Sequence, residues 1–136
     1  VRFNCGAIPS ELIDSQLFGH EKGSFTGAAD QHQGWFERSD GGTLFLDEVE
    51  KLQVEMGDKL ADALKNGIVN KETGVRKKLN IRVIAAGDSN LKRLADKGLF
   101  SKDLYELVLN TVIRVPPLRE RVKDIEVIAT HILAEM

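Results

Sequence analysis

Short apolar segments alternate with helical patterns along this 136-residue chain, and this alternation constrains the fold more than any other feature. The strand-like segments are residues 1–8, 43–46, 81–86 and 111–115. Between the second and third of them, Met56, Leu60 and Leu64 recur every four residues, which is typical of a helix with one buried side. Strands that alternate with helices predict a parallel sheet with helices on both faces. We therefore expect an α/β fold and a single domain, residues 1–136.

The composition excludes several classes of protein. A net charge of -2 gives no support for a basic surface of the kind that binds nucleic acid directly. No apolar run approaches the ~20 residues of a membrane-spanning helix. Cys5 is the only cysteine, so the chain has no internal disulfide, which fits a cytoplasmic protein. The histidines His20, His32 and His131 are too scattered for a metal site with ordinary ligand spacing.

Two adjacent acids, Asp47 and Glu48, follow the apolar segment 43–46. Ligands of open α/β sheets bind at the carboxyl ends of the strands, where these acids are expected. Phosphoryl transfer needs one acid that holds magnesium and another group that orients the attacking water, and neighbouring carboxylates can divide that work. The alternative is a solvated strand end that caps the next helix. The Gly41-Gly42-Thr43 sequence before the strand favours the nucleotide site.

The segment 23–28 reads Gly-Ser-Phe-Thr-Gly-Ala and indicates a bent loop, because glycine permits backbone conformations that other residues resist. A loop that only connects two elements does not need an aromatic residue such as Phe25 at its tip. We therefore expect this loop to contact a partner.

Three motifs give the chain its resemblance to a known family. They are Leu17–Ala28, Gly41–Glu48 and the Pro-Pro-Leu-Arg-Glu-Arg segment at 116–121. In order and spacing they resemble the AAA+ domain of sigma-54-dependent bacterial transcription activators, over essentially the whole chain. The family form of the loop motif is Gly-Ala-Phe-Thr-Gly-Ala, from which only Ser24 departs. The resemblance implies a three-layer αβα, P-loop NTPase-like domain that here starts after the first strand and its Walker A motif and lacks most of the lid.

The same resemblance implies roles for individual residues. Asp47 and Glu48 match the Walker B pair, with Asp47 holding Mg²⁺ through water, and Asn4 matches an asparagine that senses Glu48. The residues implied to contact sigma-54 are Gly23, Ser24, Phe25, Thr26, Gly27 and Ala28.

By the same resemblance, the whole protein would be a response-regulator-type activator. It would bind and hydrolyse Mg-ATP, assemble into a ring and remodel the closed promoter complex of sigma-54 RNA polymerase. A domain outside this chain would bind DNA.

Several positions depart from the family. No Gly-x-x-x-x-Gly-Lys-Ser/Thr motif is present, so we expect this chain alone to be inactive as an ATPase. Ser101 and Leu107 stand where the family carries two arginine fingers, and Asp88 stands at the sensor I position. Lys102 is a neighbouring cation that could substitute in part.

Two other interpretations stay open. In the first, the parent protein is a non-catalytic sigma-54-binding module or a regulatory subunit with a degenerate ATPase site, which the loss of both arginines favours. In the second, the chain is a generic α/β nucleotide-binding domain whose loop matches the motif by accident.

Overall fold

The computed structural model describes residues 1–19, 33–69, 76–88 and 90–136. The proposed contact loop, Gly23–Ala28, lies outside these residues. In chain order the elements are β1 (Arg2–Asn4), α1 (Ser10–Phe18), α2 (Trp35–Arg38), β2 (Thr43–Asp47), the 3-10 helix η1 (Val49–Lys51), α3 (Val54–Asn66), β3 (Ile68–Val69), β4 (Arg76–Lys77), β5 (Arg82–Ala85), α4 (Leu91–Asp96), α5 (Lys102–Val108), the 3-10 helix η2 (Leu118–Glu120) and α6 (Lys123–Glu135).

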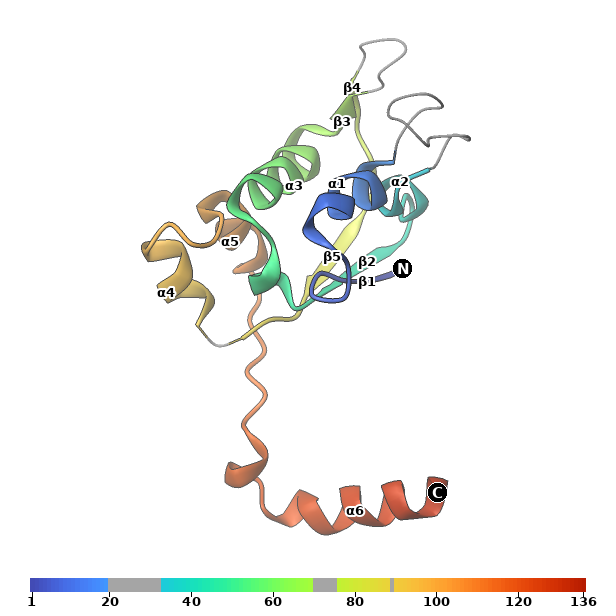
Figure 1. Cartoon of the computed structure of the whole chain (residues 1–136), viewed down its shortest axis with the longest axis vertical. Coiled ribbons are helices and arrows are strands. Elements are labelled where there is room, and N and C mark those ends of the chain that lie inside the picture. Colours follow the sequence, from blue (N-terminus) through green and yellow to red (C-terminus); the bar gives the residue numbers. More distant parts are fainter. Residues whose placement is uncertain (20–32, 70–75, 89) are drawn as a thin grey trace.

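Three of the strands form one parallel sheet in the order β1–β2–β5 (Figure 1). β2 is the central strand, and its residue Phe45 is paired with Arg2 of β1 and with Ile84 of β5. The short strands β3 and β4 form a separate antiparallel pair. The predicted α/β class with a parallel sheet is confirmed.

One buried apolar cluster joins the sheet to helices α1 to α5. Its fully or nearly fully buried members alternate along β2, where Leu44 and Leu46 are buried and their neighbours are half-buried. Larger members from the rest of the chain are Phe3, Ile13, Leu17, Phe36, Leu60, Phe100 and Leu104. This cluster fixes β1 beside β2 and thereby fixes the strand ends that carry the two acids.

Helices α3 and α5 approach closely where Gly57 faces Ser101. A Cβ atom at position 57 would lie 2.6 Å from the Cβ of Ser101, so only glycine fits there without a shift. The Ser101 hydroxyl accepts a hydrogen bond from the Leu104 N–H at 3.1 Å and donates one to Asp58 Oδ1 at 2.5 Å. Ser101 is therefore the N-cap of α5 and also a link to α3.

Two sequence predictions are wrong at β5 and beyond it. The segment 81–86 forms β5 as expected, but Ile84 is 43% exposed, because β5 lies at an edge and pairs only with β2 among the described residues. The segment 111–115 forms no strand. It runs extended towards α6 (Figure 1) and pairs with none of the described strands, and its apolar side chains are exposed.

Helix α6 lies apart from the rest of the chain in Figure 1, and none of its residues is buried. Among the described residues, no helix has both the length and the apolar character that crossing a membrane requires.

Candidate functional site

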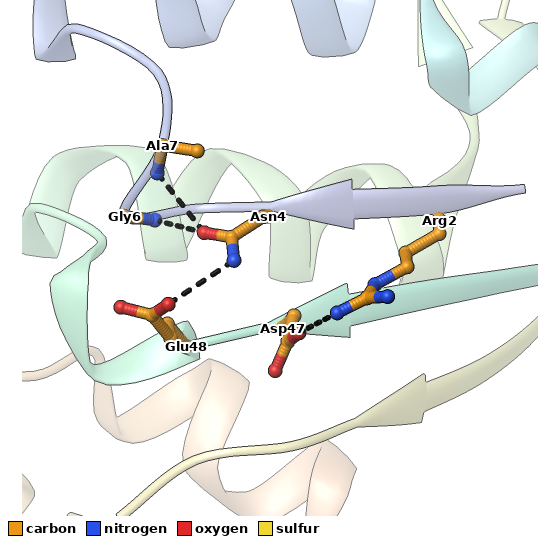
Figure 2. A network of polar contacts seen from close by, with 6 residues as sticks. All are labelled: Arg2, Asn4, Gly6, Ala7, Asp47 and Glu48. Atoms are coloured by element: carbon orange, nitrogen blue, oxygen red, sulfur yellow. Dashed lines mark hydrogen bonds and ion pairs between the residues drawn. The ribbon is translucent and has the colours of Figure 1, made fainter. Parts of the chain in front are cut away.

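The two acids lie at the carboxyl end of the central strand, as the sequence predicts. Asp47 is the last residue of β2, and its backbone oxygen accepts a hydrogen bond from the Cys5 N–H at 2.9 Å. Asn4, the last residue of β1, is the register partner of Asp47. The parallel pairing therefore places the carboxyl ends of β1 and β2, with their polar side chains, next to each other (Figure 2).

Glu48 has a left-handed backbone conformation, with φ 53° and ψ 47°, and is the only described residue other than glycine with positive φ. Such a conformation costs about 1–3 kcal/mol and persists where the surroundings hold it. Here the neighbours on both sides are fixed, because Asp47 accepts from Cys5 and the Val49 N–H donates to the Ala86 carbonyl at 3.1 Å. Glu48 makes no side-chain cap of η1, so the helix-capping alternative does not describe it.

Asn4 connects the two strand ends through both halves of its amide. Its Nδ2 donates to Glu48 Oε1 at 3.1 Å, and its Oδ1 accepts from the backbone N–H groups of Gly6 at 2.8 Å and Ala7 at 2.9 Å (Figure 2). These two acceptor contacts fix the orientation of the amide, so that the NH₂ group faces the carboxylate. Gly6 also leaves room for Glu48, because a Cβ atom there would overlap Oε2. The carboxylate is held in one place by a neutral donor.

Arg2 is a member of the site that was not found from the sequence. Its Nη2 donates to Asp47 Oδ2 at 2.6 Å, and its guanidinium carbon lies 5.9 Å from the centre of the Phe45 ring. The alternation of side chains along a strand could have indicated it. Arg2 and Asn4 are two residues apart and share one face of β1, whereas Phe3 between them is buried on the other. Each of the two acids thus has one partner from β1.

Cys5, whose N–H donates to the Asp47 backbone oxygen, is buried. Burial, together with the negative charges of Glu50, Asp47 and Glu48, raises the pKa of its thiol from 9.0 to about 12. The buried thiol therefore stays protonated and uncharged. It is not a reactive nucleophile.

Asp88, at the proposed sensor I position, follows β5, and its partners include Glu50 and Asn90. Its N–H donates to Glu50 Oε2 at 3.2 Å, and its Oδ1 accepts from the N–H and Nδ2 groups of Asn90, both at 3.2 Å. Glu50 belongs to η1, which directly follows Glu48. Asp88 therefore joins the loop after β5 to the segment that begins at the second acid.

The proposed arginine-finger positions lie on α5 and at its start, and both are used for packing. Ser101 is 1% exposed and faces Gly57 and Asp58, and Leu107 is half-buried against the core. An arginine introduced at position 101 would have no space in this arrangement. Lys102, the first residue of α5, is exposed.

The family model and the similar proteins agree on one family. The sigma-54 interaction domain family matches residues 1–114. The chain is 44% identical over 137 residues to the Nif-specific regulatory protein of Azotobacter vinelandii, covering 100% of this chain and 26% of that protein. It is 39% identical over 137 residues to the Psp operon transcriptional activator of Escherichia coli, covering 100% of this chain and 42% of the activator. The chain thus spans less than half the length of either relative.

Solved structures of one protein, NtrX from Brucella abortus, share the fold. The structure in complex with ADP has a TM-score of 0.82 and 26% identity, covering 99% of this chain and 29% of NtrX. The structure in complex with ATP has a TM-score of 0.75 and 29% identity, covering 93% of this chain and 28% of NtrX.

Proposed function

We propose that Asp47 and Glu48 are the acids of an ATPase site in the whole protein, because this chain belongs to the sigma-54 interaction domain family of transcription activators. The observation that supports the proposal most directly is the pair of contacts at the ends of β1 and β2. Glu48 is oriented by Asn4, and Asp47 lies beside it with one oxygen on Arg2. NtrX, of similar fold, has been solved with ATP and with ADP, which supports a nucleotide as the ligand.

The donor set fits magnesium bound together with a nucleotide. Among the described residues, no group of three or more His, Cys, Asp or Glu side chains could form a metal cage. Mg²⁺ is commonly held by one or two carboxylates, several waters and the phosphates of the substrate, so Asp47 with water suffices as the protein's share. When bound, Mg²⁺ would neutralise charge that develops on the phosphates. Glu48 would then orient and deprotonate the attacking water, and Asn4 would hold Glu48 until the site is complete.

The remaining assignments rest on the family. The segment Gly23–Ala28 would contact sigma-54 of the cytoplasmic RNA polymerase, with Phe25 and Thr26 at its centre. The whole protein would assemble into a ring and bind DNA through another domain. Residues 1–136 would be part of the single AAA+ domain that performs these steps.

One observation favours a second candidate, a non-catalytic sigma-54-binding module or regulatory subunit. A phosphoryl-transfer site gains about 10³–10⁵ in rate from an arginine finger. Here position 101 is closed by Gly57 and Asp58, and position 107 packs an apolar side chain. The exposed Lys102 would be the nearest replacement cation.

Steady-state ATP hydrolysis by the full-length protein tests the proposal. We expect measurable but slow turnover, and Glu48→Gln should lower it by about 100-fold or more while ATP still binds. Glu55→Gln, an exposed glutamate on α3, is the matched control and should leave the rate unchanged. Failure of the full-length protein to bind ATP would overturn the proposed site. ATP binding without turnover, with Glu48→Gln equal to wild type, would support the non-catalytic candidate instead.

A further inference from the structure

The Arg2–Asp47 ion pair joins an exposed cation to a half-buried anion. The Arg2 side chain is 70% exposed, whereas that of Asp47 is 23% exposed and sits at the end of the central strand. Arg2 pairs in register with Phe45, so its guanidinium reaches along β2, past the Phe45 ring, to the acid two residues further on (Figure 2). The arginine side chain therefore has more solvent into which it can move than the aspartate side chain has.

The two acids also differ in the charge of their partners. Glu48 is contacted by the neutral amide of Asn4, whereas Asp47 is contacted by a full positive charge. In the described part of the chain, no cation other than Arg2 contacts either carboxylate. One acid of the pair is therefore neutralised before any ligand arrives.

We infer that Arg2 is a displaceable counter-ion of Asp47, which a metal–nucleotide complex must move away from the carboxylate. This inference rests on the proposed function. A guanidinium that lies on Asp47 Oδ2 reduces the attraction of that carboxylate for a second cation, because like charges repel at short range. Arg2 would thus orient the ionised carboxylate and balance its charge in the empty site, and it would lower the affinity of the site for the metal ion.

Mn²⁺ binding to the full-length protein, measured by electron paramagnetic resonance with saturating ADP, tests the inference. Arg2→Gln should tighten Mn²⁺ binding by about fivefold, the effect of removing one unit charge near 4 Å even with full solvent screening. Arg2→Lys keeps the charge and should retain the wild-type affinity. Arg76→Gln is the matched control, because Arg76 forms an ion pair with Asp62 at 2.9 Å on another part of the chain, and it should change nothing.

Asp47→Asn separates failure of this inference from failure of the proposed function. If Asp47→Asn weakens Mn²⁺ binding and Arg2→Gln leaves it equal to wild type or weaker, Arg2 is not a counter-ion, although the metal role of Asp47 stands. If Asp47→Asn leaves Mn²⁺ binding unchanged, the metal role of Asp47 falls, and the inference falls with it. The thermal unfolding midpoint of Arg2→Gln without ligands should equal that of wild type, since exposed ion pairs contribute little to stability. A clear drop in that midpoint would make Arg2 a structural tie between the strands.

Discussion

Strands β1 and β5 lie at opposite edges of the same sheet and both pair with β2, yet the structure covers only one of them well. On the β1 side, Phe3 is buried, and the polar residues Arg2 and Asn4 have partners at the end of β2 and directly after it. On the β5 side, Ile84 is exposed, and a groove of about 580 Å³ runs along β5, the end of α5 and part of the segment 110–113. The strand with fewer apolar residues, β1, therefore has the better-defined surroundings.

The difference shows that neighbouring elements, more than strand composition, decide which residues are held in place. At the β1 edge, packing beneath the sheet and hydrogen bonds at the strand ends act on the same few residues, so the side chains of Asn4 and Glu48 have defined positions. At the β5 edge, nothing in the described chain completes the ladder. The precise chemistry is accordingly expected at the β1–β2 end of the sheet.

The largest effect is expected from truncating one side chain on β2 and one on β5. Leu46→Ala removes a fully buried side chain from β2 and should lower the free energy of unfolding by about 2–5 kcal/mol. Ile84→Ala, on β5, should lower it by about 1 kcal/mol or less, because that side chain already contacts solvent. Chemical denaturation of both variants measures the contrast. Equal losses would mean that the β5 edge is as well covered as the centre.

A smaller effect is expected where α3 meets α5 over the covered part of the core. Gly57→Ala should destabilise the chain by about 1–3 kcal/mol through overpacking, although alanine favours helix by about 1 kcal/mol. The cause is the 2.6 Å approach to the Ser101 Cβ, so the loss should shrink in a Ser101→Gly background. Denaturation of the two single variants and the double variant gives the coupling energy. Additive effects would show that the helices shift apart to admit the methyl group.

Much of the β1–β2 side could be predicted from the sequence. The apolar segment before Asp47 predicted a buried strand, which is β2. The family resemblance implied that Asn4 senses Glu48, and the hydrogen bond between them shows that the two residues lie close together. The part that was missed is Arg2, since a charged residue near the start of a strand has many possible partners until the register is known. The register of β1 against β2 is a tertiary property, and it alone brings this guanidinium to Asp47.

The β5 side was predicted less well for a related reason. The segments 81–86 and 111–115 have the composition of buried strands, but burial and pairing depend on elements beside them. The local sequence also could not show that Ser101 is buried, because a serine before a helix predicts an N-cap and says nothing of what packs over it. Gly57 from another helix closes that position.

The free energy of unfolding at alkaline pH should show how completely the fold excludes water from Cys5. The folded chain keeps its thiol protonated to a pKa of about 12, whereas the unfolded chain loses that proton near 9.0. Above pH 9 the unfolded state therefore binds fewer protons, and the free energy of unfolding should fall by about 1.4 kcal/mol per pH unit. The difference between wild type and Cys5→Ala across pH 8–10.5 isolates this slope from other titrating groups. Parallel curves for the two proteins would mean that the thiol is accessible to water.

The smallest expected effect lies in the segment 111–115 beyond β5. Ile113 is 85% exposed, so Ile113→Ser in the 136-residue chain should change the free energy of unfolding by no more than about 0.5 kcal/mol. Ile13→Ser, on α1, replaces a buried isoleucine by the same residue and should cost several times more, because it leaves both a cavity and a polar group in the core. If Ile113→Ser instead costs about 2 kcal/mol or more, a value typical of buried side chains, this segment packs into the groove beside β5. The β5 edge would then be covered by packing, as the β1 edge is.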